Sequence, residues 1–213
     1  LSGARGIAKA HELAIRFGEL GFDADIARQA LSFLSPCRPV ASPEQFAASD
    51  VVGKLAPFDG TNQADAAVGR FIDFVVNERE FRGWYGLMNY GDVQMSYYSD
   101  IDRWGFDDGG HAWLNTEGIP DYGLWLNALR AGRTDWLEAA VAMTRHNRDV
   151  DTYHWGQLKG LGTRHNVNHW GCRDKEWRVT MPLVRRLHYY LTADPWTREV
   201  IMEKKINASV FGL

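Results

Sequence analysis

Helical spacing of apolar residues is the feature that most constrains how this chain can fold. Residues 64–80 place apolar side chains at the i, i+3, i+4, i+7 and i+8 positions that give a helix one buried face: Val68, Phe71, Ile72, Val75 and Val76. Similar spacing predicts helices over residues 5–34 with a break at 18–25, and over 115–131, 135–147, 176–192 and from Pro195 onward. There is no sustained two-residue alternation, so we predict an all-α fold.

The helical segments repeat at a fixed interval. Residues 129–138 and 190–199 each combine a helix end, a short polar turn and a helix start, and 190 − 129 = 61 residues separate them. A unit of this length holds two antiparallel helices and one long loop. Repeated hairpins predict a partial α/α toroid of antiparallel helical hairpins. The aromatic, polar segments 83–114 and 148–175 are then functional loops at one end of the domain, whereas residues 35–62 are irregular.

Composition excludes some classes of partner. A net charge of −3 argues against a general nucleic-acid surface, which would be strongly basic. No run of about 18 apolar residues occurs, so we expect no membrane span. Nine tryptophans are present, many beside Gly, Asn, Asp or His. Tryptophan in this setting either fills space between helices or lines a cleft that stacks against sugar rings.

The densest group of chemically active side chains lies at residues 163–171. It contains two histidines, two asparagines and an arginine, bracketed by glycines: Arg164, His165, Asn166, Asn168 and His169, followed by Trp170. One interpretation is a zinc site, because His165 and His169 are four residues apart. The catalytic zinc motif has a glutamate beside the first histidine, where this chain has Asn166. Cys172 and His154 would complete such a site only if the fold brought them close.

A second interpretation is proton abstraction next to a carboxylate. Cleaving a uronate glycosidic bond by β-elimination removes a weakly acidic ring proton, so the enzyme must neutralise the substrate carboxylate. We predict that His165 or His169 is the base and that Tyr90 or Tyr98 protonates the leaving oxygen. Arg164 and Asn166 would neutralise the carboxylate. The further substrate-binding candidates are Asn168, Trp170, Asp92, Trp84 and His154.

A third interpretation is glycoside hydrolysis by a pair of carboxylates. The available acidic residues are Asp92, Asp102, Asp107, Asp108, Glu117, Asp149 and Asp151. The closely spaced Asp149 and Asp151 resemble a pair, but carboxylates with one spacer more often cap helices or bind cations. A non-catalytic glycan-binding module would keep the tryptophans and need no converging His and Tyr.

Five motifs occur in a fixed order along the chain. They are residues 3–12, residues 90–94, Arg145-His146 with residues 149–154, residues 164–166 with 169–171, and residues 189–192. Together these motifs resemble the exo-acting rhamnogalacturonan lyase family and its bacterial relatives. The resemblance implies a secreted or periplasmic lyase acting on an acidic polysaccharide such as plant pectin, while the net charge and hydropathy described above predict no nucleic-acid or membrane partner. It also implies that residues 1–213 are a fragment of a central α/α-toroid catalytic domain whose flanking β-domains are absent. No cofactor is required by these motifs, and whether Ca²⁺ assists stays open.

Two finer expectations concern the helix ends. Arg145, His146 and Asp149 lie at the end of the helix predicted at 135–147, so we expect them to support the site rather than to perform chemistry. The turn at residues 191–194 reads Leu-Thr-Ala-Asp where the resemblance leads us to expect Leu-Thr-Gly-Asp, which places Ala193 at a position suited to glycine.

Overall fold

A computed structural model describes most of the chain. The described residues are 6–13, 15, 17, 24–34, 36–105, 113–114, 116–156, 158–163, 175–177 and 180–210. They divide into two compact units, one of residues Ala10–Pro39 and one of Leu1–Lys9 with Val40–Leu213. The smaller unit contains α1 (Ala24–Leu34). The candidate site lies in the larger unit.

Helices dominate the larger unit, and the strands are short. The helices are α2 (Pro43–Ala48), α3 (Gln63–Arg82), α4 (Pro120–Ala131), α5 (Thr134–Asp149), α6 (Pro182–Thr192) and α7 (Pro195–Val210). Strands β1 (Ser96–Tyr98) and β2 (Arg103–Gly105) form one antiparallel pair, and β3 (Gly162–Thr163) and β4 (Lys175–Glu176) form another. The predicted mainly helical fold is therefore confirmed. No helix in the described part of the chain is both long and apolar enough to cross a membrane.

Local sequence sets the ends of α3. The side chain of Asn62 accepts hydrogen bonds from the backbone N–H groups of Ala64 and Asp65, which would otherwise be unsatisfied in the first turn. The helix ends where Gly83 adopts a left-handed conformation, with φ of 64°. This turn begins the loop that contains Trp84, Tyr90 and Asp92.

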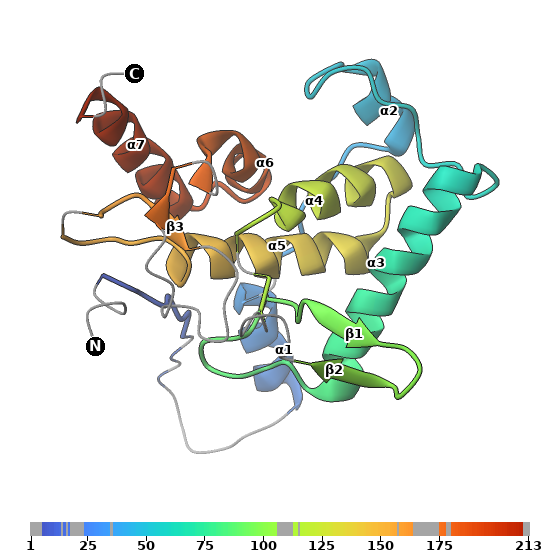
Figure 1. The fold of residues 1–213 in the computed structure, drawn as a ribbon, viewed down its shortest axis with the longest axis horizontal. Coiled ribbons are helices and arrows are strands. Elements are labelled where there is room, and N and C mark those ends of the chain that lie inside the picture. The colour runs from blue at the N-terminus through green and yellow to red at the C-terminus, as the bar shows by residue number, and fades with distance from the viewer. Residues whose placement is uncertain are drawn as a thin grey trace. The chain divides into compact units, whose positions relative to one another are not determined.

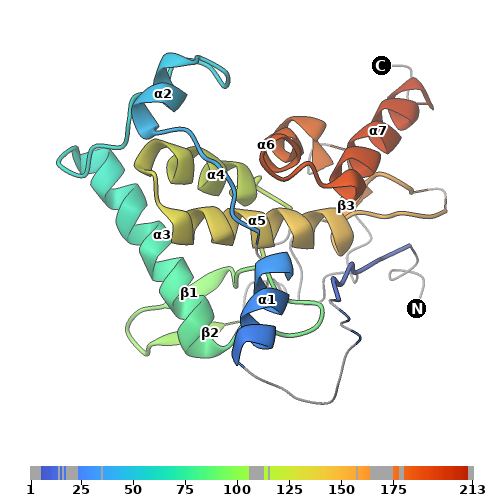
Figure 2. The same ribbon diagram turned by 180° about the vertical axis from the view of Figure 1, so that it is seen from behind.

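The core lies around the antiparallel pair α4 and α5, which lie side by side in Figures 1 and 2. Helix α3 packs near the start of α5, and α6 and α7 pack near its end. Trp125 of α4 and Trp136 of α5 are almost completely buried. Trp125 donates from its indole N–H to Thr144 Oγ1 at 2.8 Å, so the large ring is buried without an unsatisfied donor.

The predicted 61-residue repeat appears at both helical turns. Helix α4 ends at Ala131 and α6 at Thr192, whereas α5 begins at Thr134 and α7 at Pro195, so both pairs differ by 61 residues. Each first helix ends in a left-handed residue, Gly132 with φ of 64° and Ala193 with φ of 52°. The expectation that position 193 suits glycine is thus consistent with the backbone.

Several secondary-structure predictions were wrong. The described residues 6–13 are not helical, because the backbone there bonds to residues 149–154: His154 N donates to Gly6 O at 2.7 Å, and Ala8 N donates to Asp149 O at 3.3 Å. Helix α2 lies within the interval predicted to be irregular, and a β-hairpin lies within residues 83–114. Helix α6 begins at Pro182 rather than near 176, because the proline is suited to a first turn.

Candidate functional site

A groove of about 460 Å³ opens beside the loop that follows α3. Its polar lining is supplied by Arg82, Arg103, Asn89 and Gln94, and its aromatic lining by Trp84, Trp104 and Trp113, with Gly83 and Gly86 between them. A volume of this size falls within the ~300–1,000 Å³ typical of small-ligand sites. Amide and guanidinium donors in the same groove as indole rings suit a ligand that is a sugar and carries negative charge.

The aromatic side of the groove is a packed tryptophan cluster. Trp84 is only 5% exposed, and its ring lies edge-to-face with those of Trp104 and Trp113 at 5.1 and 6.1 Å between centroids. Trp104 is fixed by its indole N–H, which donates to Glu78 Oε2 at 2.7 Å. The same Glu78 oxygen accepts from Arg82 Nε at 2.9 Å. The cluster therefore acts as a rigid wall, and the predicted substrate contact of Trp84 is limited to its small exposed edge.

Both predicted tyrosine acids lie near this groove. Tyr90 directly follows the groove residue Asn89, is 40% exposed and stacks on Tyr85 with 5.6 Å between ring centroids. Tyr98 is half-buried in β1, where it pairs in register with Arg103 of β2. Residues directly opposite each other in an antiparallel pair project to the same face, so Tyr98 shares a face of the hairpin with a groove arginine.

A second polar group is completely buried. His146 on α5 lies between Asp92 and Asp151, with its Nε2 at 3.3 Å from one oxygen of each carboxylate, and all three side chains have 0% exposure. Burial alone would lower the pKa of His146, but Asp151 and Asp92 outweigh it and raise that pKa to about 10. These contacts bring the loops 83–114 and 148–175 together at one end of α5, as the repeat predicted.

Gly91 makes the approach of Asp92 to α5 feasible. Its φ is 101°, which L side chains rarely adopt, and an added Cβ would collide with the carbonyl oxygen of Ala142. Ala142 precedes His146 by one helical turn on the same face. The loop backbone thus presses directly on α5 and holds the Asp92 carboxylate against the imidazole.

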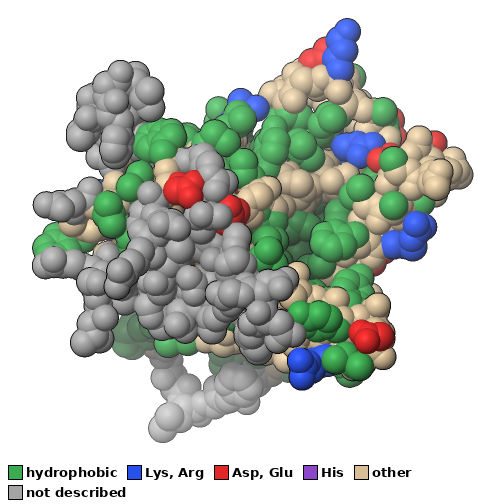
Figure 3. All heavy atoms as spheres, viewed as in Figure 1, with side chains coloured by type: hydrophobic (Ala, Val, Ile, Leu, Met, Phe, Trp, Pro, Cys, Tyr) green, Lys and Arg blue, Asp and Glu red, His purple; other side chains and the backbone are tan. Residues whose placement is uncertain are grey.

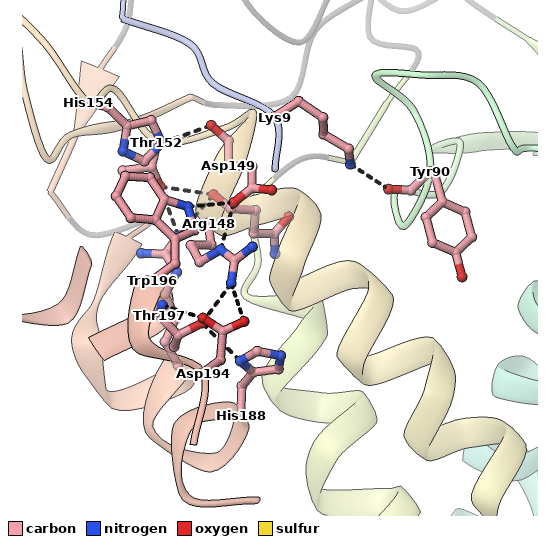
Figure 4. A network of polar contacts seen from close by, with 12 residues as sticks. Lys9, Tyr90, Arg148, Asp149, Thr152, His154, His188, Asp194, Trp196 and Thr197 are labelled. Carbon is pink, nitrogen blue, oxygen red and sulfur yellow. Dashed lines mark hydrogen bonds and ion pairs between the residues drawn. The ribbon is translucent and has the colours of Figure 1, made fainter. Parts of the chain in front are cut away.

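A network of buried ionic contacts holds the end of α5 (Figure 4). Arg148 Nε donates to Asp149 Oδ1 at 2.6 Å, and its Nη1 donates to Asp194 Oδ2 at 2.8 Å. The indole N–H of Trp196 also donates to Asp149 Oδ1, at 2.9 Å. His154, proposed above as a substrate ligand, packs against Trp196 with the rings tilted by 36° and 5.0 Å between their centroids. Its Nε2 lies 2.9 Å from the backbone oxygen of Asp149. This places His154 within the supporting network.

Lys9 is a residue that the sequence reasoning missed. Its Nζ donates to the backbone oxygen of Tyr90 at 3.4 Å, as Figure 4 shows. Burial lowers the pKa of Lys9, and Arg145 and Arg148 act in the same direction, whereas Asp149 and Asp151 oppose the shift. A half-buried amine beside the tyrosine loop can place a positive charge near a bound carboxylate. Its only sequence signal was membership of the motif at residues 3–12.

The densest predicted cluster lies outside the described residues. This applies to His165, His169, Arg164, Asn166, Asn168 and Trp170, whose roles stay predictions. The residue that precedes them is fixed, because Thr163 N donates to Asp151 O at 2.7 Å and Thr163 O accepts from Thr116 Oγ1 at 2.7 Å. Thr163, the last described residue before this cluster, thus lies next to the buried Asp151.

Asp92 was predicted to bind substrate in a cleft, but its side chain does not line one in this structure. Its side chain is enclosed between the loop and α5, so in this structure it contacts protein rather than solvent. Asp149 and Asp151 are buried as well. The paired carboxylates that a hydrolase would direct across a cleft are therefore not found among these three residues. The spacing of Asp149 and Asp151 was the signal that could have indicated a buried polar centre.

A separate hollow on the face shown in Figure 3 is apolar. It measures about 260 Å³ and lies between α3 and α4, with Phe71, Ile72, Val75 and Leu124 among its lining residues. It has few polar groups, in contrast to the groove beside the tryptophan cluster. The groove is accordingly the better candidate for a charged sugar.

Comparisons with known proteins agree with the helical repeat. Residues 36–211 match the family described as the PcRGLX-like protein C-terminal alpha/alpha toroid domain. The chain is also 36% identical, over 205 residues, to the Bacillus subtilis (strain 168) protein named Uncharacterized protein YetA. That alignment covers 94% of the chain and 24% of the Bacillus protein, so the chain spans about a quarter of this relative.

Proposed function

Because this chain belongs to the family of PcRGLX-like C-terminal α/α toroid domains, we propose that it is the catalytic part of a polysaccharide lyase. The substrate is a uronate-containing glycan of the rhamnogalacturonan type, and the reaction is β-elimination. The helical hairpins form part of an α/α toroid. The whole protein is secreted or periplasmic, where such glycans occur.

The groove of Arg82, Arg103 and Asn89 beside Tyr90 is the observation that carries this proposal. A uronate needs cationic and amide donors at its carboxylate, and β-elimination needs an acid at the leaving oxygen. Both are supplied within the short stretch that joins α3 to β2. Lys9 adds a further positive charge at the same loop.

The proton transfers follow from the residue types. His165 or His169 removes the ring proton, since imidazole accepts a proton near neutral pH without a large pKa shift. Tyr90 or Tyr98 then protonates the leaving oxygen. Arg164 and Asn166 hold the carboxylate of the uronate that loses its proton, so their hydrogen bonds strengthen as negative charge develops on it in the transition state. The groove beside Tyr90 holds the carboxylate of a neighbouring uronate in the same glycan chain.

Incubation of the full-length protein with rhamnogalacturonan tests this function. A lyase produces an unsaturated uronyl group, so ultraviolet absorbance should rise together with the number of new reducing ends. A hydrolase would produce reducing ends without that absorbance, and a binding module would produce neither. Homogalacturonan, which lacks rhamnose, and a neutral glucan are the matched controls for substrate class.

The groove is tested separately with Arg103→Ala. Arg103 is exposed at the groove and lies opposite Tyr98, so loss of its charge should weaken binding of acidic oligosaccharides about tenfold. Added salt should reduce the difference between wild type and variant. Arg70→Ala, which removes another exposed arginine, on α3 and outside the groove lining, should leave binding unchanged. Equal affinities for wild type and Arg103→Ala would exclude this groove as the carboxylate site.

A further inference from the structure

We propose that Asp92, His146 and Asp151 bind a divalent first-row metal ion, zinc or manganese. The three side chains come from the loop after α3, from α5 and from the segment after α5. Their facing nitrogen and oxygen atoms all lie within 4.8 Å of one another. This site is distinct from the groove, and the inference does not depend on the proposed lyase function.

The distances fit metal ligands better than hydrogen bonds. His146 Nε2 lies 3.3 Å from Asp92 Oδ2 and 3.3 Å from Asp151 Oδ2. A charge-assisted N–H···O bond is normally shorter, about 2.7–2.9 Å. Donor atoms that each lie about 2.0–2.2 Å from one ion, at tetrahedral or octahedral angles, are roughly 3.0–3.5 Å apart. Both separations from the His146 nitrogen match the edge length expected for such a coordination shell.

Contacts outside the cluster hold the Asp92 carboxylate and the backbone that carries Asp151 and His146. Val93 N donates to Asp92 Oδ1 at 2.7 Å, which orients the carboxylate so that Oδ2 faces His146. The segment that carries Asp151 is tied down by Val150 N, which donates to His146 O at 2.8 Å. Thr163 N donates to the Asp151 backbone oxygen at 2.7 Å. Hydrogen bonds of this kind fix the ligands of protein metal sites.

The donor set selects the class of ion. One imidazole and two carboxylates suit zinc, manganese or iron, whereas Ca²⁺ and Mg²⁺ prefer oxygen ligands alone. Complete burial of all three side chains favours an ion acquired during folding over one that exchanges freely at a surface. Such an ion would join the tyrosine loop to the segment that precedes residues 164–170.

The competing arrangement contains no ion. In that case a protonated His146 holds both carboxylates, and the charges of Arg185 and Lys9 act on Asp151 as well. The two arrangements differ in metal content and in the response of the protein to chelators. They can be separated without any measurement of enzymatic activity.

The test is metal analysis of the full-length protein purified without chelators. We expect about one equivalent of zinc or manganese by mass spectrometry, and removal with EDTA should lower the melting temperature until Zn²⁺ or Mn²⁺ is restored. Calorimetric titration of the stripped protein with each ion should show one site. Asp92→Asn and His146→Gln should weaken binding at least tenfold, whereas the exposed control Asp100→Asn should not.

Because buried variants can fail to fold, the unmodified protein supplies a second measurement. X-ray absorption at the zinc edge, or electron paramagnetic resonance of bound Mn²⁺, should show one imidazole nitrogen together with oxygen ligands. The proposal is overturned if the stripped wild type binds neither ion below millimolar concentration. It is equally overturned if folded Asp92→Asn and His146→Gln retain wild-type affinity, or if the bound ion has no imidazole ligand.

Discussion

Arg148 donates from Nη1 to Asp194 Oδ2 at 2.8 Å, an ion pair that joins the end of α5 to the turn before α7. The arginine side chain is 1% exposed. The other oxygen of Asp194 accepts from the backbone N–H of Thr197 at 2.8 Å, in the first turn of α7. The Asp194 carboxylate therefore compensates the charge of a buried guanidinium and also caps α7, so its removal should destabilise the fold.

Asp194→Ala should lower the free energy of unfolding by about 2–4 kcal/mol, since it removes a helix cap worth about 1 kcal/mol and one of two carboxylates that compensate the buried Arg148, worth about 1–3 kcal/mol. The loss arises because Arg148 stays buried without this partner. Urea unfolding of the full-length protein, followed by far-ultraviolet circular dichroism, measures the change. The exposed control Asp100→Ala should be near neutral, and equal stability of the two variants would contradict the assigned role.

The same carboxylate predicts how stability depends on pH. Burial would raise the pKa of Asp194, but the Thr197 N–H and Arg148 outweigh it and lower that pKa below its ordinary value. A lowered pKa means that the stabilising contribution is present above about pH 3.9, the ordinary value, and is lost as pH falls through the folded-state value. The stability difference between wild type and Asp194→Asn should therefore shrink below pH 4. Unfolding curves from pH 3 to pH 7 measure it, and a constant difference would be inconsistent with this origin.

Ala193→Gly should stabilise the protein. Ala193 has φ of 52°, and a left-handed conformation costs an L residue with a Cβ roughly 1–2 kcal/mol, part of which glycine recovers. We expect a gain of about 0.5–1 kcal/mol in the free energy of unfolding. The matching turn between α4 and α5 offers the opposite substitution as a control. Gly132→Ala places a Cβ on a residue with φ of 64° and should lower the free energy of unfolding. Changes of the same sign in both variants would argue against conformational strain as the cause.

Much of the helical architecture was predictable because it rests on local signals. The apolar period of residues 64–80 and the repeat of the turns at 132–133 and 193–194 depend on side chains close together in sequence. The errors have a different origin. Residues 6–13 bond to the distant segment 149–154, and such tertiary pairing overrides helical spacing.

The sequence predicted which loops contain the candidate site better than it predicted where the individual side chains lie. Sequence identified the loop containing Tyr90 and the loop after α5 as functional, and the structure brings them together at His146. It did not show that Asp92 would be buried, since that depends on the contact of Gly91 with α5. Lys9 was missed for the same reason, because it reaches Tyr90 across 81 residues of sequence.

Lys9 should contribute positive charge to substrate binding. In the proposed lyase, Lys9→Met should lower kcat/KM on rhamnogalacturonan about 10–100-fold, and Lys9→Arg should retain more activity because it keeps the charge. Since burial lowers the pKa of Lys9, the wild-type rate should fall with rising pH at a lower value than an ordinary lysine would give. Lys9→Arg should move this alkaline limb upward, which the pH profile of kcat/KM measures. An unchanged profile in Lys9→Arg, or loss of activity in the exposed control Lys54→Met, would count against the assignment.

Tyr90 and its neighbour Tyr85 form a matched pair for testing the acid. Their rings stack at 5.6 Å and both are partly exposed, so Phe at either position preserves the stack and removes one hydroxyl. Burial raises the pKa of Tyr85, and a hydrogen bond between its hydroxyl and Glu80 raises that pKa further. If Tyr90 protonates the leaving oxygen, Tyr90→Phe should lower kcat about 10²–10⁴-fold, the usual contribution of a general acid, whereas Tyr85→Phe should stay within about threefold. Steady-state rates of unsaturated product formation measure both. If Tyr90→Phe retains more than about a tenth of wild-type kcat, the Tyr90 hydroxyl lowers the barrier by less than ~1.4 kcal/mol and Tyr90 is not the acid. Tyr98 would then be the acid, because it is the other predicted acid and shares a face of the hairpin with the groove residue Arg103.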